Sequence, residues 1–83
     1  MSFLLINEII TQNWNMSQSA RERIANKIKQ YRVMRGLKRE ELSLILGFDN
    51  SYISKLERAN VNITIDKLSK IADYFEVDVI DLL

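Results

Sequence analysis

The feature that most constrains this chain is its scarcity of helix-breaking residues, since it contains no proline and only two glycines, Gly36 and Gly47. Before, between and after them, apolar residues recur every three or four positions, the spacing that puts side chains on one face of an α-helix. A glycine after such a segment is typical of a helix end, because glycine adopts the left-handed conformation without strain. The sequence therefore predicts an all-α chain in which both glycines end helices.

The first two predicted helices lie on either side of the first glycine. One covers residues 17–35, with Ser17 or Ser19 as the N-cap whose hydroxyl accepts a backbone N–H bond. The next covers residues 39–46 and stops at the second glycine. Its expected apolar residues are Leu42, Ile45 and Leu46, and the acidic residues that suit its positive N-terminal end are Glu40 and Glu41.

Three further helices are predicted in the second half of the chain, each after a residue that can cap it. The caps and ranges are Asp49 before 50–59, Thr64 before 65–75, and Asp78 before 79–83. Asn60 is expected to take the left-handed conformation where the third helix ends, because asparagine tolerates it. The resulting fold class is all-α, with five helices behind an apolar N-terminal extension.

Composition excludes several classes of function. The 83 residues include no cysteine and no histidine, so disulfides, a thiol nucleophile and the usual zinc ligands are absent. There is no glycine-rich phosphate loop and no carboxylate pair better explained by catalysis than by helix capping. No apolar run approaches the roughly 20 residues of a membrane span, and residues 1–10 lack the basic leader of a signal peptide. We expect a cytoplasmic, non-enzymatic protein with no metal, cofactor, membrane or small-molecule ligand.

Charge is distributed unevenly, although the net charge of the chain is only +1. Between residues 21 and 39, eight lysines and arginines face one glutamate, which gives +7, whereas residues 40–83 carry four positive and nine negative side chains, which gives −5. Such a chain can present a basic face to a polyanion, and it can equally be a solvated helical domain. Charge alone leaves both interpretations open.

The predicted second and third helices are short and joined by a tight turn, which is the arrangement of a helix-turn-helix. The second helix of that motif enters the DNA major groove with its N-terminal end, so it needs an apolar docking face and short polar residues opposite. Tyr52, Ile53 and Leu56 supply the apolar face. The outer arc contains Asn50, Ser51, Ser54 and Lys55. Asparagine can pair with adenine and lysine with guanine, although an ordinary amphipathic helix has the same pattern.

A longer pattern makes the resemblance specific. Residues 24–83 include "YRVMRGLKREELSLILGF", then "SYISKLER", then "LSKIA". This order resembles the lambdoid-repressor (Cro/CI, XRE) helix-turn-helix family. The small size, the "YIS" and "LER" words of the third helix and the "NITID" loop are most similar to controller proteins of restriction–modification systems. The resemblance implies a lambda-repressor-like DNA-binding domain over residues 17–83, with residues 1–16 as a separate extension.

The resemblance also implies roles for single residues. Base reading falls to Asn50, Ser51, Ser54 and Lys55. Contacts to the DNA backbone fall to Lys38, Arg39, Tyr52, Arg58, Asn60 and Asn62. Arg32 and Glu57 match a partly buried ion pair that braces the first helix against the third. The sequence departs from the family pattern in three places. Lys38 replaces the usual capping serine or threonine, and Ser43 replaces a small alanine, which fits if its hydroxyl bonds back to the preceding turn. Ala59 replaces the frequent glycine at the helix end, so the helix exit is expected to shift to Asn60.

Dimerisation is the second implication, and it centres on the last helix. Val79, Ile80 and Leu83 are the predicted dimer residues, with Ile80 and Val77 expected to face inward and Val79 and Leu83 outward. Residues 1–16 contain apolar side chains at helical spacing and are expected to pack on their own domain or on a partner subunit. Those side chains are Phe3, Leu5, Ile6, Ile9, Ile10 and Trp14.

The sequence thus favours a homodimeric, sequence-specific transcriptional regulator that binds double-stranded DNA at a pseudo-palindromic operator. A controller of a restriction–modification operon, a phage-type repressor and an antitoxin all remain open. Glu40 and Glu41 form a candidate contact for RNA polymerase, although such residues more often satisfy a helix N-terminus. The alternative from another class is a protein-interaction adaptor that keeps the fold without binding DNA.

Overall fold

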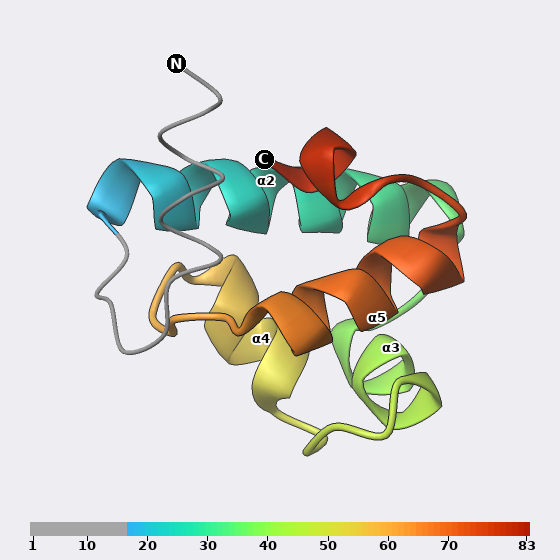
Figure 1. Cartoon of the computed structure of the whole chain (residues 1–83). Coiled ribbons are helices and arrows are strands. Elements are labelled where there is room, and N and C mark those ends of the chain that lie inside the picture. Colours follow the sequence, from blue (N-terminus) through green and yellow to red (C-terminus); the bar gives the residue numbers. More distant parts are fainter. Residues whose placement is uncertain (1–16) are drawn as a thin grey trace.

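A computed structural model describes residues 17–83, and within that range the chain is entirely helical, with no strand (Figure 1). The elements are α2 (Gln18–Met34), α3 (Arg39–Ile45), α4 (Tyr52–Glu57), α5 (Ile65–Phe75) and the 3₁₀ helix η1 (Val79–Leu82). The all-α fold class is confirmed. The predicted fifth helix is a single 3₁₀ turn rather than an α-helix.

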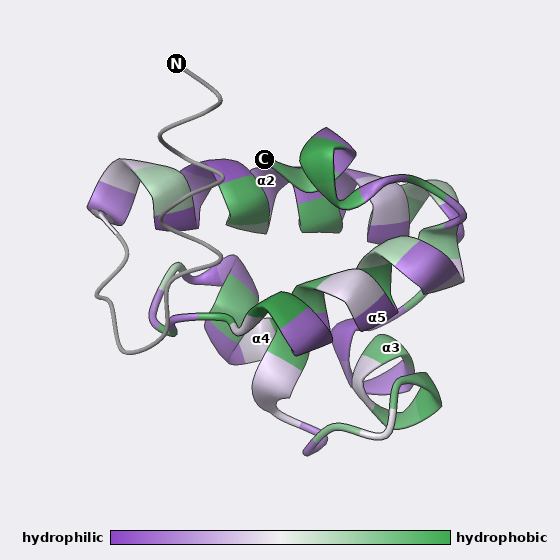
Figure 2. Cartoon of the chain, in the orientation of Figure 1, coloured by the Kyte–Doolittle hydropathy of each residue, from purple (hydrophilic) through white to green (hydrophobic). Residues whose placement is uncertain are grey.

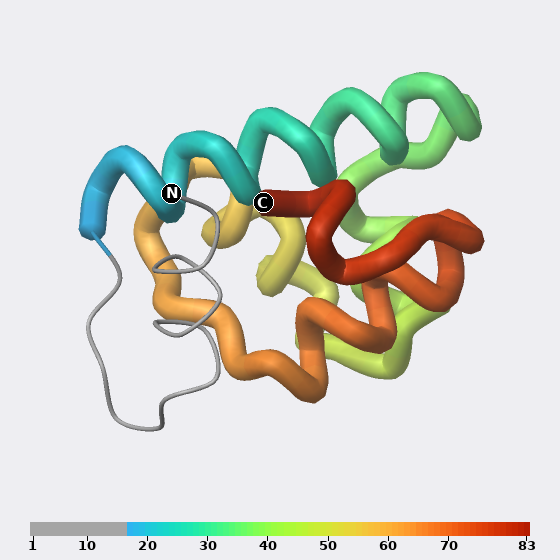
Figure 3. The backbone as a smooth tube through the Cα atoms, turned by 45° about the horizontal axis from the view of Figure 1, so that its top comes forward, coloured from blue at the N-terminus to red at the C-terminus, as the bar shows by residue number. Residues whose placement is uncertain are grey.

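The helices divide into two groups. The long helix α2 runs along one side of the domain, and η1 packs against both α2 and α5, as Figures 1 and 3 show. We call α2, α5 and η1 the scaffold. The two short helices α3 and α4 pack against each other, and α4 also packs against α2. We call α3, α4 and the turn between them the motif.

The core lies where both groups meet. It contains the buried side chains Ala20, Ile24, Ile28, Leu42, Leu46, Ile53, Leu56, Ile63, Leu68, Ile71, Ala72, Phe75 and Leu82. Apolar segments of α2, α4 and α5 face one another across this core in Figure 2. Tyr31 of α2 stacks on Phe75 of α5 with 5.5 Å between the ring centroids. The motif therefore shares its core with the scaffold, which fixes its orientation.

Two apolar residues of η1 point differently from the prediction. Ile80 is 52% exposed, whereas Leu82 is fully buried. The reason is the 3₁₀ geometry, in which residues three apart share a face. Val79 and Leu82 therefore turn to the core, and Ile80 turns away. Partly buried against the core are Val77, Val79 and Leu83. The expectation that Ile80 faces inward is wrong, and so is the expectation that Val79 faces outward. In α3, Ile45 is 51% exposed, because Leu42 and Leu46 occupy the buried face.

Helix ends follow one pattern. In α2 the N–H groups of Gly36 and Leu37 donate to the carbonyls of Val33 and Arg32, which is the Schellman arrangement around a glycine at φ +68°. The helices α4 and α5 end the same way, but their left-handed residues are Ala59 and Glu76, each at φ 59°. The predicted left-handed exit at Asn60 is wrong, because the chain places Ala59 there instead.

The predicted N-caps of α2 and α5 are confirmed, whereas that of η1 is not. Ser17 Oγ accepts a hydrogen bond from the N–H of Ala20 at 3.2 Å, and Thr64 Oγ1 accepts one from the N–H of Lys67 at 3.2 Å. Asp78 makes no side-chain cap, and its N–H donates instead to Asp81 Oδ2 at 3.1 Å. The helices α2 and α5 are thus capped by the side-chain oxygens of their own N-cap residues.

The predictions for the packing of residues 1–16 lie outside the described residues. The division of the chain at residue 17 stays a prediction. Within residues 17–83, no helix is long and apolar enough to cross a membrane. The same range contains no group of histidine, cysteine or carboxylate residues that would hold a metal ion.

Candidate nucleic-acid interface

The turn between α3 and α4 is closed by backbone hydrogen bonds. Gly47 has φ +76°, and its N–H donates to the carbonyl of Leu44 at 3.0 Å. The N–H of Phe48 donates to the carbonyl of Ser43 at 2.9 Å. A residue with a Cβ is strained at this φ, so glycine lets the chain reverse within a few residues. This turn sets the angle at which α4 follows α3.

The start of α4 differs from the prediction. The helix begins at Tyr52 with Ser51 as its N-cap, and no side-chain oxygen of that cap accepts a hydrogen bond. The predicted cap, Asp49, acts through its backbone instead, because its carbonyl accepts the N–H of Tyr52 at 2.9 Å. Asn50 therefore lies in the turn before the helix.

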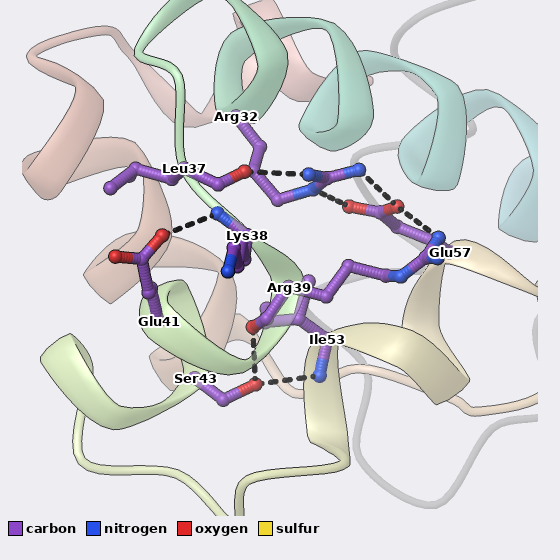
Figure 4. Close-up of polar contacts among 8 residues, drawn as sticks. All are labelled: Arg32, Leu37, Lys38, Arg39, Glu41, Ser43, Ile53 and Glu57. Atoms are coloured by element: carbon purple, nitrogen blue, oxygen red, sulfur yellow. Dashed lines mark hydrogen bonds and ion pairs between the residues drawn. The ribbon is translucent and has the colours of Figure 1, made fainter.

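The missing cap is supplied by Ser43 of α3 (Figure 4). This side chain is fully buried, and its Oγ donates to the carbonyl of Arg39 at 3.0 Å, the back-bond that the sequence predicted. The same oxygen accepts the N–H of Ile53 at 3.1 Å. One hydroxyl thus satisfies a donor in the first turn of α4 and joins the two helices. This second bond was not predicted from the sequence, although a serine on a buried helix face is its signal.

A buried ion pair joins α4 to the scaffold. Arg32 Nε donates to Glu57 Oε2 at 2.6 Å, and its Nη2 donates to Oε1 at 3.0 Å, so the contact is bidentate. The third guanidinium nitrogen, Nη1, donates to the carbonyl of Leu37 at 2.7 Å. Only 10% of the arginine side chain and 3% of the glutamate side chain are exposed. Buried charges are tolerable here because each has hydrogen-bonded partners.

The four predicted base-reading residues lie in the turn and on the outer arc of α4. Asn50 and Lys55 are exposed, while Ser51 and Ser54 are half-buried. The inward residues Ile53 and Leu56 are buried, so the two faces of this helix separate as expected. The amide of Asn50 donates to Glu40 Oε2 at 3.5 Å, the outer limit of a hydrogen bond.

The predicted phosphate-contacting residues cluster at the start of α3 and the end of α4. Arg39 is the first residue of α3, its side chain is about half exposed, and its Nη1 lies 3.7 Å from Glu57 Oε1. Lys38 is exposed, and its backbone N–H donates to Glu41 Oε1 at 2.7 Å. Arg58 and Asn60 are exposed beside the end of α4. Basic side chains therefore stand at one end of the motif.

A family model for helix-turn-helix proteins, HTH_3, matches residues 28–82. This range contains both helices of the motif and the side chains that brace them. The chain belongs to the HTH_3 helix-turn-helix family. No curated protein matches it significantly.

Solved structures of HTH_3 regulators and related proteins have the same fold. A hypothetical transcription factor from Neisseria is 29% identical with a TM-score of 0.74, and the alignment covers 89% of this chain and 87% of that one. An HTH_3 family transcriptional regulator from Vibrio cholerae is 28% identical with a TM-score of 0.70, covering 78% of this chain but only 36% of the longer protein. The restriction–modification controller protein C.AhdI from Aeromonas hydrophila is 23% identical with a TM-score of 0.72, covering 78% of this chain and 98% of the controller.

These matches support a DNA-binding transcriptional regulator and confirm the resemblance to the lambdoid-repressor type of helix-turn-helix. At 23% identity the Aeromonas controller shows a shared fold and nothing more. The match to the Vibrio regulator covers the helix-turn-helix part of a longer chain. The family therefore accounts for the motif.

Two residues assigned to the DNA backbone lie differently within this HTH_3 domain. The hydroxyl oxygen of Tyr52 is buried, has no hydrogen-bond partner among residues 17–83, and so cannot reach a phosphate from this position. Desolvation by burial raises its pKa to about 12. Asn62 Oδ1 accepts hydrogen bonds from Arg21 Nη2 at 2.8 Å and Nε at 3.2 Å. Asn62 thus connects its loop to α2. The two residues are far apart in the sequence, so no local pattern indicates this contact.

The contacts between the turn and α5 were also not predicted from the sequence. Two lysines of α5, Lys67 and Lys70, lie against the aromatic rings of Phe48 and Tyr52. Their spacing of three residues on one helix face was the available signal, but the rings that they contact lie about 20 positions earlier in the chain.

Proposed function

We propose that this HTH_3 protein binds a pseudo-palindromic DNA operator as a homodimer, with α4 in the major groove, and thereby regulates transcription. The main support for the proposal is that α4 has an apolar face and a polar face. Its apolar face is buried, its position is set by Ser43 and Glu57, and its outer arc consists of short polar side chains and one lysine. A rigidly held polar arc is what base reading requires.

Base reading is assigned to Asn50, Ser51, Ser54 and Lys55. The amide of Asn50 matches the N6 and N7 atoms of adenine, and the ammonium group of Lys55 matches O6 or N7 of guanine. Arg39, Lys38, Arg58 and Asn60 would contact phosphates and set the register of α4 in the groove. The hydrogen bond from Asn50 to Glu40 is long, so exchanging it for a base costs little.

The homodimer is proposed around η1. Ile80 is half exposed beside the partly buried Val79 and Leu83, which together form an apolar surface at the end of the chain. A two-fold pair of domains would present two α4 helices to half-sites about 34 Å apart. This separation is a property that DNA protection can measure.

Footprinting on the DNA upstream of the protein's own gene, combined with a salt titration, tests the function. We expect protection of a pseudo-palindrome and a steep linear fall of log K with log salt. Absence of binding to that DNA and to random duplex would instead favour the adaptor, in which the fold serves protein contacts. The sequence also resembles restriction–modification controller proteins. Protection of DNA at a restriction–modification operon would support that more specific role.

Two variants separate base reading from phosphate binding. Asn50→Ala should lower operator affinity by ~1–3 kcal/mol and relax the preference at one base pair. Asn26→Ala removes an exposed asparagine from α2 and serves as the matched control. Arg39→Ala should weaken operator and random DNA alike and reduce the salt slope by about 1. An Asn50→Ala protein that bound every sequence equally weakly would refute the base-reading role.

The oligomeric state has its own test. Ile80→Asp should shift the protein toward monomer in sedimentation analysis, because a carboxylate cannot be buried unpaired at an apolar interface. Ile45→Asp is the matched control, since Ile45 is equally exposed but lies on α3. If both variants or neither remained dimeric, the assignment of the interface to η1 would fail.

A further inference from the structure

The turn between α3 and α4 carries a cluster of two cations and two aromatic rings. Lys67 Nζ lies 4.4 Å from the centroid of the Tyr52 ring and 5.6 Å from that of Phe48. Lys70 Nζ lies 5.6 Å from the centroid of Phe48. The two rings pack edge to face with 4.9 Å between their centroids. We call these four residues the lysine–aromatic cluster.

The position of the cluster relates it to the recognition helix. Phe48 and Tyr52 flank Asp49, Asn50 and Ser51 in the chain, so both ammonium groups are held next to the N-terminal end of α4. Arg39 contacts Glu57 and therefore stands near the opposite end of that helix. In Figure 1, the start of α5 indeed lies next to α4.

The lysines of the cluster form no close ion pair within the described part of the chain. No ion pair in residues 17–83 joins a carboxylate to either lysine, and the nearby acidic residues Asp49, Asp66 and Asp73 are exposed. A cation–π contact holds an ammonium group in place without cancelling its charge. Lys70 is exposed and Lys67 is half-buried, so solvent reaches both side chains.

We propose that Lys67 and Lys70 form a second phosphate-binding site, which takes the DNA backbone beside the N-terminal end of α4. The aromatic rings orient the two ammonium groups before DNA arrives, which lowers the entropy lost on binding. Together with Arg39, the site grips the backbone at both ends of the recognition helix. This inference rests on the proposed DNA-binding function and adds residues from α5, outside the motif.

The competing role for the cluster is purely structural, in which the lysines only fasten α5 to the turn. Replacement of both lysines by methionine distinguishes the two roles, because methionine keeps the apolar stem over the rings and removes the charge. Replacement of both by arginine keeps the charge and the contact with the rings. Lys29→Met, an exposed lysine on α2, is the matched control.

The experiment measures the affinity of each full-length variant for the protected operator and for random duplex over a salt series, together with its melting temperature. For K67M/K70M we expect weaker binding to both duplexes and a salt slope reduced by about 0.9 per lost phosphate contact. The melting temperature should change little. The arginine pair should restore affinity and slope, and Lys29→Met should resemble the wild type.

Unchanged affinity and slope in K67M/K70M, with or without a lower melting temperature, would overturn the inference and leave the cluster a structural clamp. Should the methionine pair fail to fold, the single variant Lys70→Met replaces it, because Lys70 is the more exposed of the two. A wild-type protein that bound neither duplex would refute the proposed function itself, and this inference with it.

Discussion

The scaffold and the motif obtain their helices in different ways. In the scaffold, α2 and α5 have 17 and 11 residues and begin with their own hydroxyl caps, Ser17 and Thr64. In the motif, α3 and α4 have 7 and 6 residues, and neither Lys38 nor Ser51 provides a side-chain cap. Helices this short are unstable alone in water. The motif must therefore be stabilised by residues outside each helix.

Those residues are few and buried. Ser43 of α3 accepts a backbone N–H of α4, and Arg32 of α2 pairs with Glu57 of α4. The N–H of Lys38 is satisfied by Glu41, a local contact. The motif thus depends on contacts between positions that are distant in the chain. Substitutions of these buried partners should cost more than comparable substitutions in the scaffold, whereas loss of a local cap should cost more in the scaffold. Four measurements test this difference.

The largest effect is expected from Glu57→Gln. It leaves Arg32 buried without a counter-charge, so the free energy of unfolding should fall by ~3 kcal/mol or more in urea titration. Glu76→Gln is the scaffold control, because its contact with Arg35 is 3.9 Å long and exposed; it should change stability by less than ~1 kcal/mol. Equal losses in the two variants would remove the proposed difference.

The next largest effect is expected from Ser43→Ala. Loss of the hydroxyl leaves the N–H of Ile53 buried and unpaired, which costs ~1–3 kcal/mol. Hydrogen exchange should also accelerate more at the Ile53 amide than at the amides of α5. Ser69→Ala, on α5, is the control and should stay within ~0.5 kcal/mol. Unaltered exchange at Ile53 would show that Ser43 does not cap α4.

A smaller contrast involves the N-caps themselves. Thr64→Ala removes a working cap of α5 and should lower the unfolding free energy by ~1 kcal/mol in thermal or urea denaturation. Ser51→Ala removes an N-cap hydroxyl that makes no cap bond, so it should be nearly neutral. If Ser51→Ala cost as much as Thr64→Ala, α4 would depend on a local cap after all.

The smallest effect concerns pH and Tyr52. Its pKa is raised from 10.0 to about 12 by desolvation, so the folded state favours the neutral phenol. That contribution to stability is complete below pH 10 and is lost as the pH rises to about 12. Urea titrations at successive pH values should show less loss across this window for Tyr52→Phe than for the wild type. Tyr74→Phe is the control; a parallel pH dependence of all three proteins would contradict the burial of the hydroxyl.

Local patterns were sufficient for much of the fold. Apolar spacing predicted every helical segment of residues 17–83, and Ser17, Thr64 and the two glycines marked ends correctly, because caps act within one helical turn. The errors were also local in origin. Asp49 resembles a cap, and Asn60 resembles a left-handed exit, yet packing assigned these roles to Ser43 and Ala59. The residue type at one position does not reveal a hydrogen-bond partner that lies ten residues away in the chain.

The sequence by itself determined the all-α class, the membership of the helix-turn-helix family and the polar arc of α4, since each depends on residue type at short spacing. Tertiary structure alone decided that Ile80 faces outward, that the hydroxyl of Tyr52 is buried, and that Lys67 and Lys70 lie at the turn. The physical reason is that exposure and charge placement depend on which surfaces meet, and those surfaces are distant in the chain.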